Sequence, residues 1–304
     1  MHASLVRPVV WLLAGSVCTT LLPPSPRPCC AQGMLGQLKE EVEHGEKQKK
    51  TSTDDESFFG SDDDHHYHDH HDDDHHLFDI LEPAAGEWLW LAATSPFWYP
   101  RLLAGDDGEA DRDFLTYPYQ ADFPGYWMHQ HDRRQAGIGT YYPWLLRLRG
   151  EYGEDFDSIR RVSMGVLYDT DLRVGLDASL DYYREWLPGG LRDDLWLGDI
   201  NVVYRFAQSE RFALRSGLGV NYLTGTGSTD FGFNFTYGGD WLPARPWILS
   251  ANIDVGTLGK VGFFRGRATV GINIRKVEFF TGYDYLDVGT VQIGNVIGGI
   301  RLWY

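Results

Sequence analysis

Apolar and polar residues alternate along residues 137–304, in segments of about ten residues separated by Gly, Asp, Ser and Pro. From Phe264 to Ile274, for example, every second residue is apolar or Gly, and the residues between them are Arg, Thr, Gly or Asn. Successive side chains of a β-strand point to opposite faces. The pattern therefore predicts strands with one apolar and one polar face.

Ten such segments follow one another, and their connections alternate between tight turns and mostly longer loops. The segments begin near Tyr142, Ile159, Val174, Leu195, Arg211, Phe231, Trp247, Phe263, Val277 and Val291. Membrane β-barrels of bacteria have an even number of antiparallel strands, with short periplasmic turns and longer external loops. We therefore expect residues 137–304 to form an all-β, antiparallel up-and-down transmembrane β-barrel of about ten strands, with eight or twelve as alternatives.

A soluble exported barrel, such as a lipocalin-like binding protein, would show the same alternation with its apolar face inward. Two features of the faces favour the membrane. Aromatic residues gather at both ends of the apolar faces, as the two interfacial girdles of a membrane barrel do. The polar face mixes Arg with Asp and Glu and contains almost no Lys, unlike a surface that faces water.

The chain also ends in alternating apolar residues, Ile300, Leu302 and the terminal Tyr304. On these residues and on the alternation, residues 137–304 resemble the broad class of outer-membrane β-barrel proteins of Gram-negative bacteria. The resemblance implies that the C-terminal residues act as an insertion signal. It also implies two partners, the outer-membrane bilayer and the barrel-insertion machinery.

The polar face of such a barrel would line its lumen with a network of charges. We expect this network to contain Arg147, Arg149, Glu151, Arg161, Asp177, Asp181, Asp199, Arg205, Arg215, Asp240, Asp254, Arg265, Arg267, Glu278, Asp284 and Arg301. Buried charges need partners, and the guanidinium fork suits carboxylates. The network predicts either a largely filled lumen that keeps the barrel rigid or a narrow, porin-like path for small polar solutes.

Residues 1–31 read as a cleavable signal peptide. Arg7 supplies the basic start, and the apolar stretch from Val9 to Leu22 is too short to span a membrane comfortably. All three cysteines lie here, so the predicted mature chain has no disulfide and no cysteine nucleophile. We expect export to the outer membrane, with the N-terminal segment of the mature chain in the periplasm.

Residues 32–78 are acidic, poor in apolar residues and expected to be disordered. Residues 1–136 carry 10 basic and 24 acidic residues, whereas residues 137–304 carry 17 and 19, so the net charge of −16 resides mainly in the first part. A run of His and Asp includes His65, His66, His68, His70, His71, His75 and His76. Such a run is either a solvated spacer or a tract that captures a divalent metal, the one cofactor that the sequence suggests.

Residues 79–136 are rich in aromatic residues and proline without a clear period. Trp and Tyr favour membrane interfaces. This periplasmic or interfacial segment is expected to pack on the periplasmic mouth, plug the lumen or lie on the bilayer, and the sequence leaves these three open.

No catalytic residues are expected. Enzymes on barrels of this size typically use a histidine base, and residues 137–304 contain no histidine and no G-x-S-x-G element. The acidic balance disfavours nucleic-acid binding. The sequence therefore favours a barrel of structural or interaction type, with a periplasmic partner as one option. A narrow pore, metal capture and a soluble binding protein are the alternatives.

Overall fold

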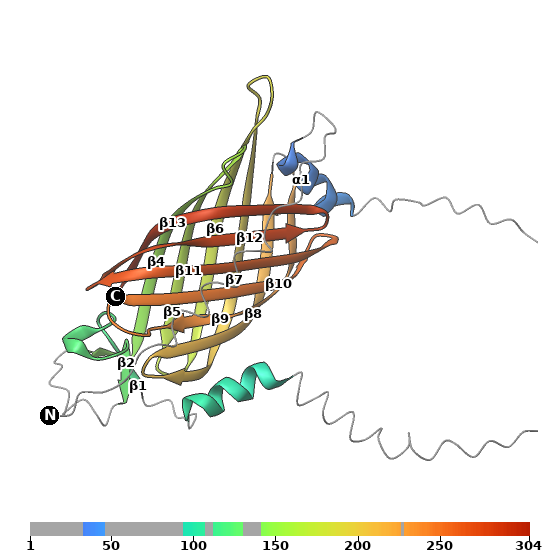
Figure 1. Ribbon diagram of the computed structural model, residues 1–304. Helices are drawn as coiled ribbons and strands as arrows, with labels where there is room; N and C mark the ends of the chain where they lie inside the picture. The colour runs from blue at the N-terminus through green and yellow to red at the C-terminus, as the bar shows by residue number, and fades with distance from the viewer. Residues whose placement is uncertain (1–32, 46–93, 107–111, 130–140, 226–227) are drawn as a thin grey trace, which may run out of the picture. The chain divides into compact units, whose positions relative to one another are not determined.

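The computed structural model describes residues 33–45, 94–106, 112–129, 141–225 and 228–304. Ten antiparallel strands close into a barrel in the order β10-β11-β12-β13-β4-β5-β6-β7-β8-β9 (Figure 1). They are β4 (Trp144–Glu154), β5 (Ile159–Thr170), β6 (Val174–Trp186), β7 (Arg192–Ser209), β8 (Phe212–Thr224), β9 (Thr229–Trp241), β10 (Trp247–Leu258), β11 (Val261–Ile274), β12 (Val277–Val288) and β13 (Val291–Trp303). The predicted fold class is confirmed, and each strand begins within three residues of its predicted start.

The last strand closes the barrel against the first. β13 pairs with β4 in antiparallel register from Val296↔Glu154 to Trp303↔Arg147. Beyond that register, the backbones of Leu146 and Tyr304 exchange hydrogen bonds of 3.0 and 2.9 Å. The closure therefore leaves no free edge on the first and last strands.

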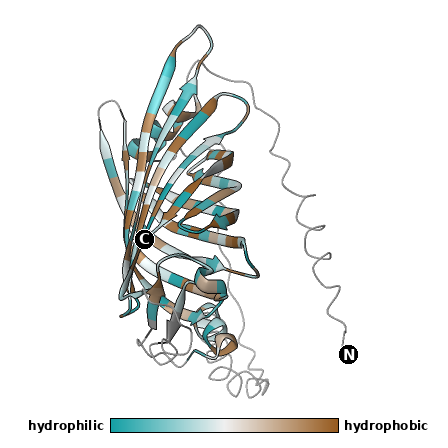
Figure 2. Ribbon diagram, turned by 90° about the vertical axis from the view of Figure 1, so that its left-hand side faces the viewer, coloured by the Kyte–Doolittle hydropathy of each residue, from teal (hydrophilic) through white to brown (hydrophobic). Residues whose placement is uncertain are grey.

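Alternation along each strand separates a polar interior from an apolar exterior. On β5, Val162, Met164 and Val166 are exposed on the outside, whereas Arg161 and Ser163, at alternate positions, are buried. Figure 2 shows the same alternation of hydrophobic and hydrophilic residues along the strands. Since a soluble barrel would turn its apolar face inward, this arrangement excludes the lipocalin-like alternative.

The barrel has two distinguishable ends. Residues 171–173, 210–211, 242–246 and 275–276 connect strands at the end that we call the short-turn end. Residues 155–158, 187–191, 225–228, 259–260 and 289–290 connect them at the long-loop end. Two of the latter connections are as short as the shortest turns, and the connection 242–246 at the short-turn end is as long as 187–191, so the two ends differ less in connection length than the sequence suggests.

Helix α1 (Met34–His44) packs at the long-loop end. The expectation that residues 32–78 are disordered does not hold for this stretch. Leu35, Leu38 and Val42 recur at helical spacing and form one apolar face, which the barrel buries completely. The His/Asp-rich tract and the signal peptide lie outside the described residues.

A small sheet of β1 (Arg112–Leu115), β2 (Trp127–His129) and β3 (Tyr141–Tyr142) packs at the short-turn end, with the 3-10 helix η1 (Gln120–Asp122) between β1 and β2. Residues 94–104 form a further helix. None of the helices in the described ranges has the length and apolar character that crossing a membrane requires.

Candidate functional site

The interior near the long-loop end holds a cluster of buried ion pairs, which we call the long-loop cluster. It consists of Glu151, Arg161, Asp181, Arg265, Arg267 and Asp284. Arg265 donates to Asp181 Oδ2 at 2.6 Å and to Asp284 Oδ2 at 3.0 Å. Arg161 pairs with Glu151 and Asp284, and all these side chains are at least nine-tenths buried.

A second cluster, the short-turn cluster, lies toward the opposite end and consists of Arg147, Asp169, Arg205, Arg215 and Asp240. The Arg215 guanidinium donates to Asp169 Oδ2 at 3.0 Å and to Asp240 Oδ2 at 2.9 Å. Arg205 Nη1 lies 2.6 Å from Asp169 Oδ2, and Arg147 donates to Asp240 Oδ2 at 2.8 Å. Each carboxylate thus meets two guanidinium groups, which satisfies the requirement that buried charges be paired.

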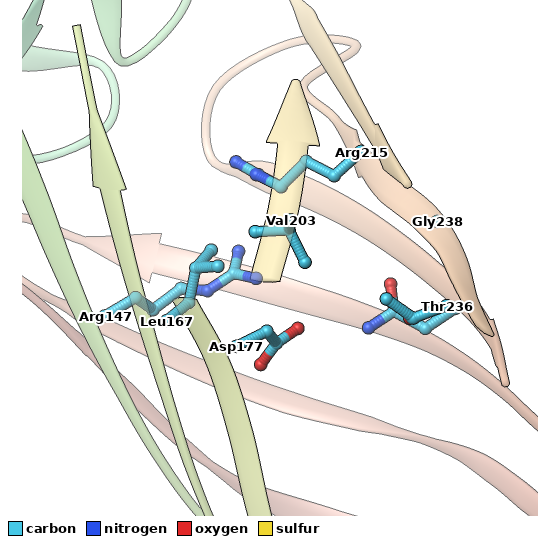
Figure 3. A pocket seen from close by; sticks show the side chains of 8 residues that line it. Arg147, Leu167, Asp177, Val203, Arg215, Thr236 and Gly238 are labelled. Carbon is cyan, nitrogen blue, oxygen red and sulfur yellow. The ribbon is translucent and has the colours of Figure 1, made fainter. Parts of the chain in front are cut away.

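Beside this cluster is a small cavity. Figure 3 shows Arg147 and Asp177 pointing into the same space, which Asn252 and Thr236 also line. It has room for about one water molecule. A single ordered water fits the cavity, whereas a solute of metabolite size does not.

Asp106 and residues 112–127 pack at the mouth of the barrel at the short-turn end. Phe114, Tyr126 and Trp127 are buried against barrel residues that include Leu145 and Trp303. Arg205 lies over the rings of Phe114 and Trp127, at 4.9 and 5.8 Å from their centroids. We call Asp106 and residues 112–127 the cap.

Polar contacts hold the cap to the barrel. Tyr126 accepts a hydrogen bond of 2.7 Å from Arg215, which links the cap to the short-turn cluster. Asp106 accepts two hydrogen bonds from Arg173, at 2.7 and 2.6 Å, and a third from the backbone of Gln208 at 3.0 Å. Burial of its hydroxyl raises the pKa of Tyr126.

Tyr119 ties the cap to the start of β10. Its hydroxyl donates to the carbonyl oxygen of Trp247 at 2.6 Å. Burial raises the pKa of Tyr119 to about 12 from the ordinary 10.0. The seated cap therefore holds this proton more tightly than an exposed tyrosine would.

Helix α1 packs at the opposite mouth. Its three buried apolar residues pack against a ring of barrel residues, namely Ile159, Tyr183, Leu195, Leu197, Leu223, Leu258, Val261, Phe263, Leu286, Val288, Val291 and Ile293. Glu185 accepts from the backbone amides of Met34 and Leu35 at 2.9 and 2.8 Å, so a barrel carboxylate caps the helix N-terminus. Lys39 pairs with Asp193, and Thr290 donates its amide to Glu41 at 2.8 Å.

The predicted lumen residues all lie on barrel strands. Ion pairs join Arg147, Arg149, Glu151, Arg161, Asp181, Arg205, Arg215, Asp240, Arg265, Arg267, Glu278, Asp284 and Arg301. The remaining three predicted residues, Asp177, Asp199 and Asp254, lie on the inner faces of β6, β7 and β10. Asp199 accepts hydrogen bonds from Ser179 and Asn201.

The sequence analysis missed Asp169, Asp106, Arg173 and Tyr126. Counting every second residue from Arg161 along β5 would have assigned Asp169 to the inner face. Asp106 and Tyr126 belong to a segment without periodicity, and Arg173 lies in a turn, so no pattern pointed to them.

The predicted metal ligands His65, His66, His68, His70, His71, His75 and His76 lie outside the described residues. Across the ranges that the structure covers, no group of three or more His, Cys, Asp or Glu side chains is arranged to hold a metal ion.

The barrel exterior is apolar over most strands. Exposed outward-facing side chains include Val162, Met164, Val166, Leu176, Ile200, Val202, Leu218, Val220, Phe233, Ile253, Val255, Ile272, Phe279, Val296 and Ile300. Aromatic residues flank them, with Tyr168, Tyr204, Trp241, Trp247 and Tyr304 toward the short-turn end and Tyr152, Trp196, Phe231 and Phe264 toward the other. An apolar belt between two aromatic girdles is the surface that a bilayer covers. The fold is that of the bacterial outer-membrane β-barrels.

Comparisons with known proteins add two distant structural neighbours. No family model matches the chain, and no curated protein matches it. The Yersinia pestis outer membrane protein Ail, solved in a phospholipid bilayer nanodisc, shares 13% identity over 53% of this chain and 99% of its own, with a TM-score of 0.32. A chain from a study of in-meso crystallization of membrane proteins shares 10% identity over 53% of this chain and 83% of its own, with a TM-score of 0.23. At these identities neither neighbour indicates an activity for this barrel.

Proposed function

We propose that this protein is an outer-membrane β-barrel of structural or interaction type, whose filled lumen is closed to solutes. The observation that carries the proposal is a pair of salt bridges that cross the lumen. Arg147 on β4 pairs with Asp240 on β9, and Arg265 on β11 pairs with Asp181 on β6. In each pair the two strands are five positions apart in the ring of ten, and therefore lie on opposite sides of the barrel.

These crossings support a packed polar core in place of a channel. A pore needs a continuous water-filled path, whereas here two levels of the lumen are bridged by side chains in direct contact. The bridges also resist opening. Removing one partner of a buried pair leaves an uncompensated charge, at a cost of about 3–5 kcal/mol.

The two mouths support the same conclusion. The cap covers the short-turn end with the aromatic side chains of Phe114, Tyr126 and Trp127, and α1 covers the other end. A solute would have to displace both before it reached the ion-pair clusters.

The proposed location is the outer membrane, with the short-turn end toward the periplasm. The signal peptide predicted in residues 1–31 supports export. In this orientation the cap faces the periplasm, whereas α1 lies at the external mouth. We expected the N-terminal segment of the mature chain in the periplasm. In this orientation α1, which belongs to that segment, lies on the external side instead.

The insertion signal at Ile300, Leu302 and Tyr304 points to the barrel-insertion machinery as a partner. A non-catalytic role is supported by the lack of histidine in residues 137–304. The cap, which the chain presents to the periplasm in this orientation, is where a periplasmic partner would bind.

Planar-bilayer conductance tests the proposal. The purified full chain should give no steady conductance, because both lumen clusters block the path. The variant R147A/R265A, which removes one partner of each crossing, should give only transient ion steps, because the cap and α1 must still leave the two mouths, whereas R160A, at the exposed pair of Arg160 with Glu154, should remain silent. Steady open channels in the unmodified protein would contradict the proposal and favour the narrow pore.

A further inference from the structure

The helix of residues 94–104 lies against the outer wall of the barrel. Phe97 packs edge-on against Phe206 and Tyr237, with ring centroids 5.3 and 5.9 Å apart. Tyr237 also donates its hydroxyl to the carbonyl oxygen of Pro96 at 2.8 Å. Tyr237 faces outward on β9, and Phe206 continues the outward-facing series of β7, so the contact is with the membrane-facing side of the wall.

This contact lies at the level of the aromatic girdle near the short-turn end. Tyr204 precedes Phe206 by two residues on β7, and Trp241 follows Tyr237 by four on β9. Both are exposed to about half of their surface, at 48% and 53%. The helix is therefore continuous with the belt that the bilayer covers.

The rest of the helix presents large apolar side chains outward. Leu102 and Leu103 are 70% and 67% exposed, and Tyr99 is 52% exposed. At about 100° per residue, Arg101 lies roughly 160° from both Tyr99 and Leu103 around the helix axis. Arg101 donates to the carbonyl oxygen of Asp106, on the side that leads back to the cap.

We propose that residues 94–104 form an interfacial helix that lies in the periplasmic leaflet and inserts Tyr99, Leu102 and Leu103 among the phospholipid acyl chains. This inference rests on the proposed membrane location. A helix with aromatic and leucine residues on one side and its charge on the other binds the headgroup boundary lengthwise. Phe97 fixes it to the barrel wall, and Arg101 reaches back to the polar side.

We assign lipid as the molecule that covers the exposed helix face, because this face continues the apolar belt and aromatic girdle that the bilayer covers. Tyrosine and tryptophan rings suit the headgroup level, with an apolar body and a polar edge. The helix also joins the wall to the cap through Asp106, so lipid binding would hold the cap in place at the rim.

Site-directed spin labelling of the full chain in phosphatidylethanolamine/phosphatidylglycerol vesicles tests the proposal. Cys18, Cys29 and Cys30 are replaced by Ser, and a nitroxide is attached at L102C. Collisions of the label with oxygen, which concentrates in lipid, are compared with collisions with a water-soluble nickel chelate. The proposal predicts that oxygen relaxes the Leu102 label more strongly than nickel does.

Two matched positions make the result decisive. L191C lies in a long loop, where leucine is 66% exposed, and its label should respond mainly to nickel. V202C lies on the outer wall of β7, 57% exposed, and should respond mainly to oxygen. An aqueous signal at Leu102 with a lipid signal at Val202 would overturn the interfacial helix and leave the membrane barrel standing. Aqueous signals at both would overturn the proposed function itself.

Discussion

Arg147 and Asp240 meet across the full width of the barrel, with 2.8 Å between Arg147 Nη1 and Asp240 Oδ2. Their strands, β4 and β9, share no backbone hydrogen bonds and stand opposite one another in the ring. Because Asp240 also accepts from Arg215 on β8 and from Ser250 on β10, one carboxylate ties together four strands. The barrel wall is thereby braced from inside as well as by its backbone ladder.

Loss of Asp240 should destabilise the barrel more than loss of any surface carboxylate. D240A leaves Arg147 and Arg215 buried without their shared partner, and we expect a loss of about 3–5 kcal/mol in the free energy of unfolding. The control is D122A, since Asp122 and Arg245 form a pair whose side chains are 85% and 63% exposed. An exposed pair contributes about 0–1 kcal/mol. Urea unfolding in detergent micelles measures the free energy of unfolding of both variants. Equal losses in D240A and D122A would contradict a stabilising role of the ion pairs of Asp240 inside the barrel.

The cap should loosen at alkaline pH. Tyr119 has a pKa of about 12 when the cap is seated, against 10.0 when it is exposed. The stabilisation is therefore fully present below pH 10 and is lost as the pH rises toward 12. Limited proteolysis between Ser95 and Trp127 should accelerate across this window.

The matched variant for this effect is Y119F, which keeps the ring but has no proton to lose. Its cap should be somewhat weaker at neutral pH, because the hydrogen bond to Trp247 is gone, and its cleavage rate should depend less on pH between 10 and 12. An unchanged pH dependence would show that another group controls the loosening.

Helix α1 should be held at the long-loop mouth when the protein is in the membrane. With the three native cysteines replaced by Ser, E41C and T290C should form a disulfide under mild oxidation, since Glu41 accepts hydrogen bonds from Thr290. E43C with T290C is the control, because Glu43 is exposed on the helix. Absence of the E41C/T290C disulfide in vesicles would show that α1 does not occupy this mouth.

The sequence predicted the barrel well because its strands obey a local rule. Once alternation assigned Arg265 and Arg267 to the inner face, the other inward residues of β11 followed from their spacing, and the same count along β6 placed Asp181. The pairing of Arg265 with Asp181 was not predicted, because charge and alternation do not specify which carboxylate each guanidinium meets across the closed barrel.

The closures at the two mouths could not be predicted in this way. Leu35, Leu38 and Val42 show a helical period, but the acidic and polar residues around them masked it. The cap depends on contacts between distant segments, such as Asp106 with Arg173 and Tyr126 with Arg215, which no local pattern encodes. Such contacts depend on the folded barrel, which brings their partners together.

The central claim is that the chain forms a closed barrel in the outer membrane, and heat-modifiability in fractionated membranes tests it most directly. Membranes from cells that produce the full chain are separated, and the protein is run on SDS gels with and without boiling. We predict enrichment in the outer-membrane fraction and a change of mobility on boiling, because a closed barrel resists SDS until it is heated. A soluble periplasmic protein with the same mobility in both lanes would contradict the account.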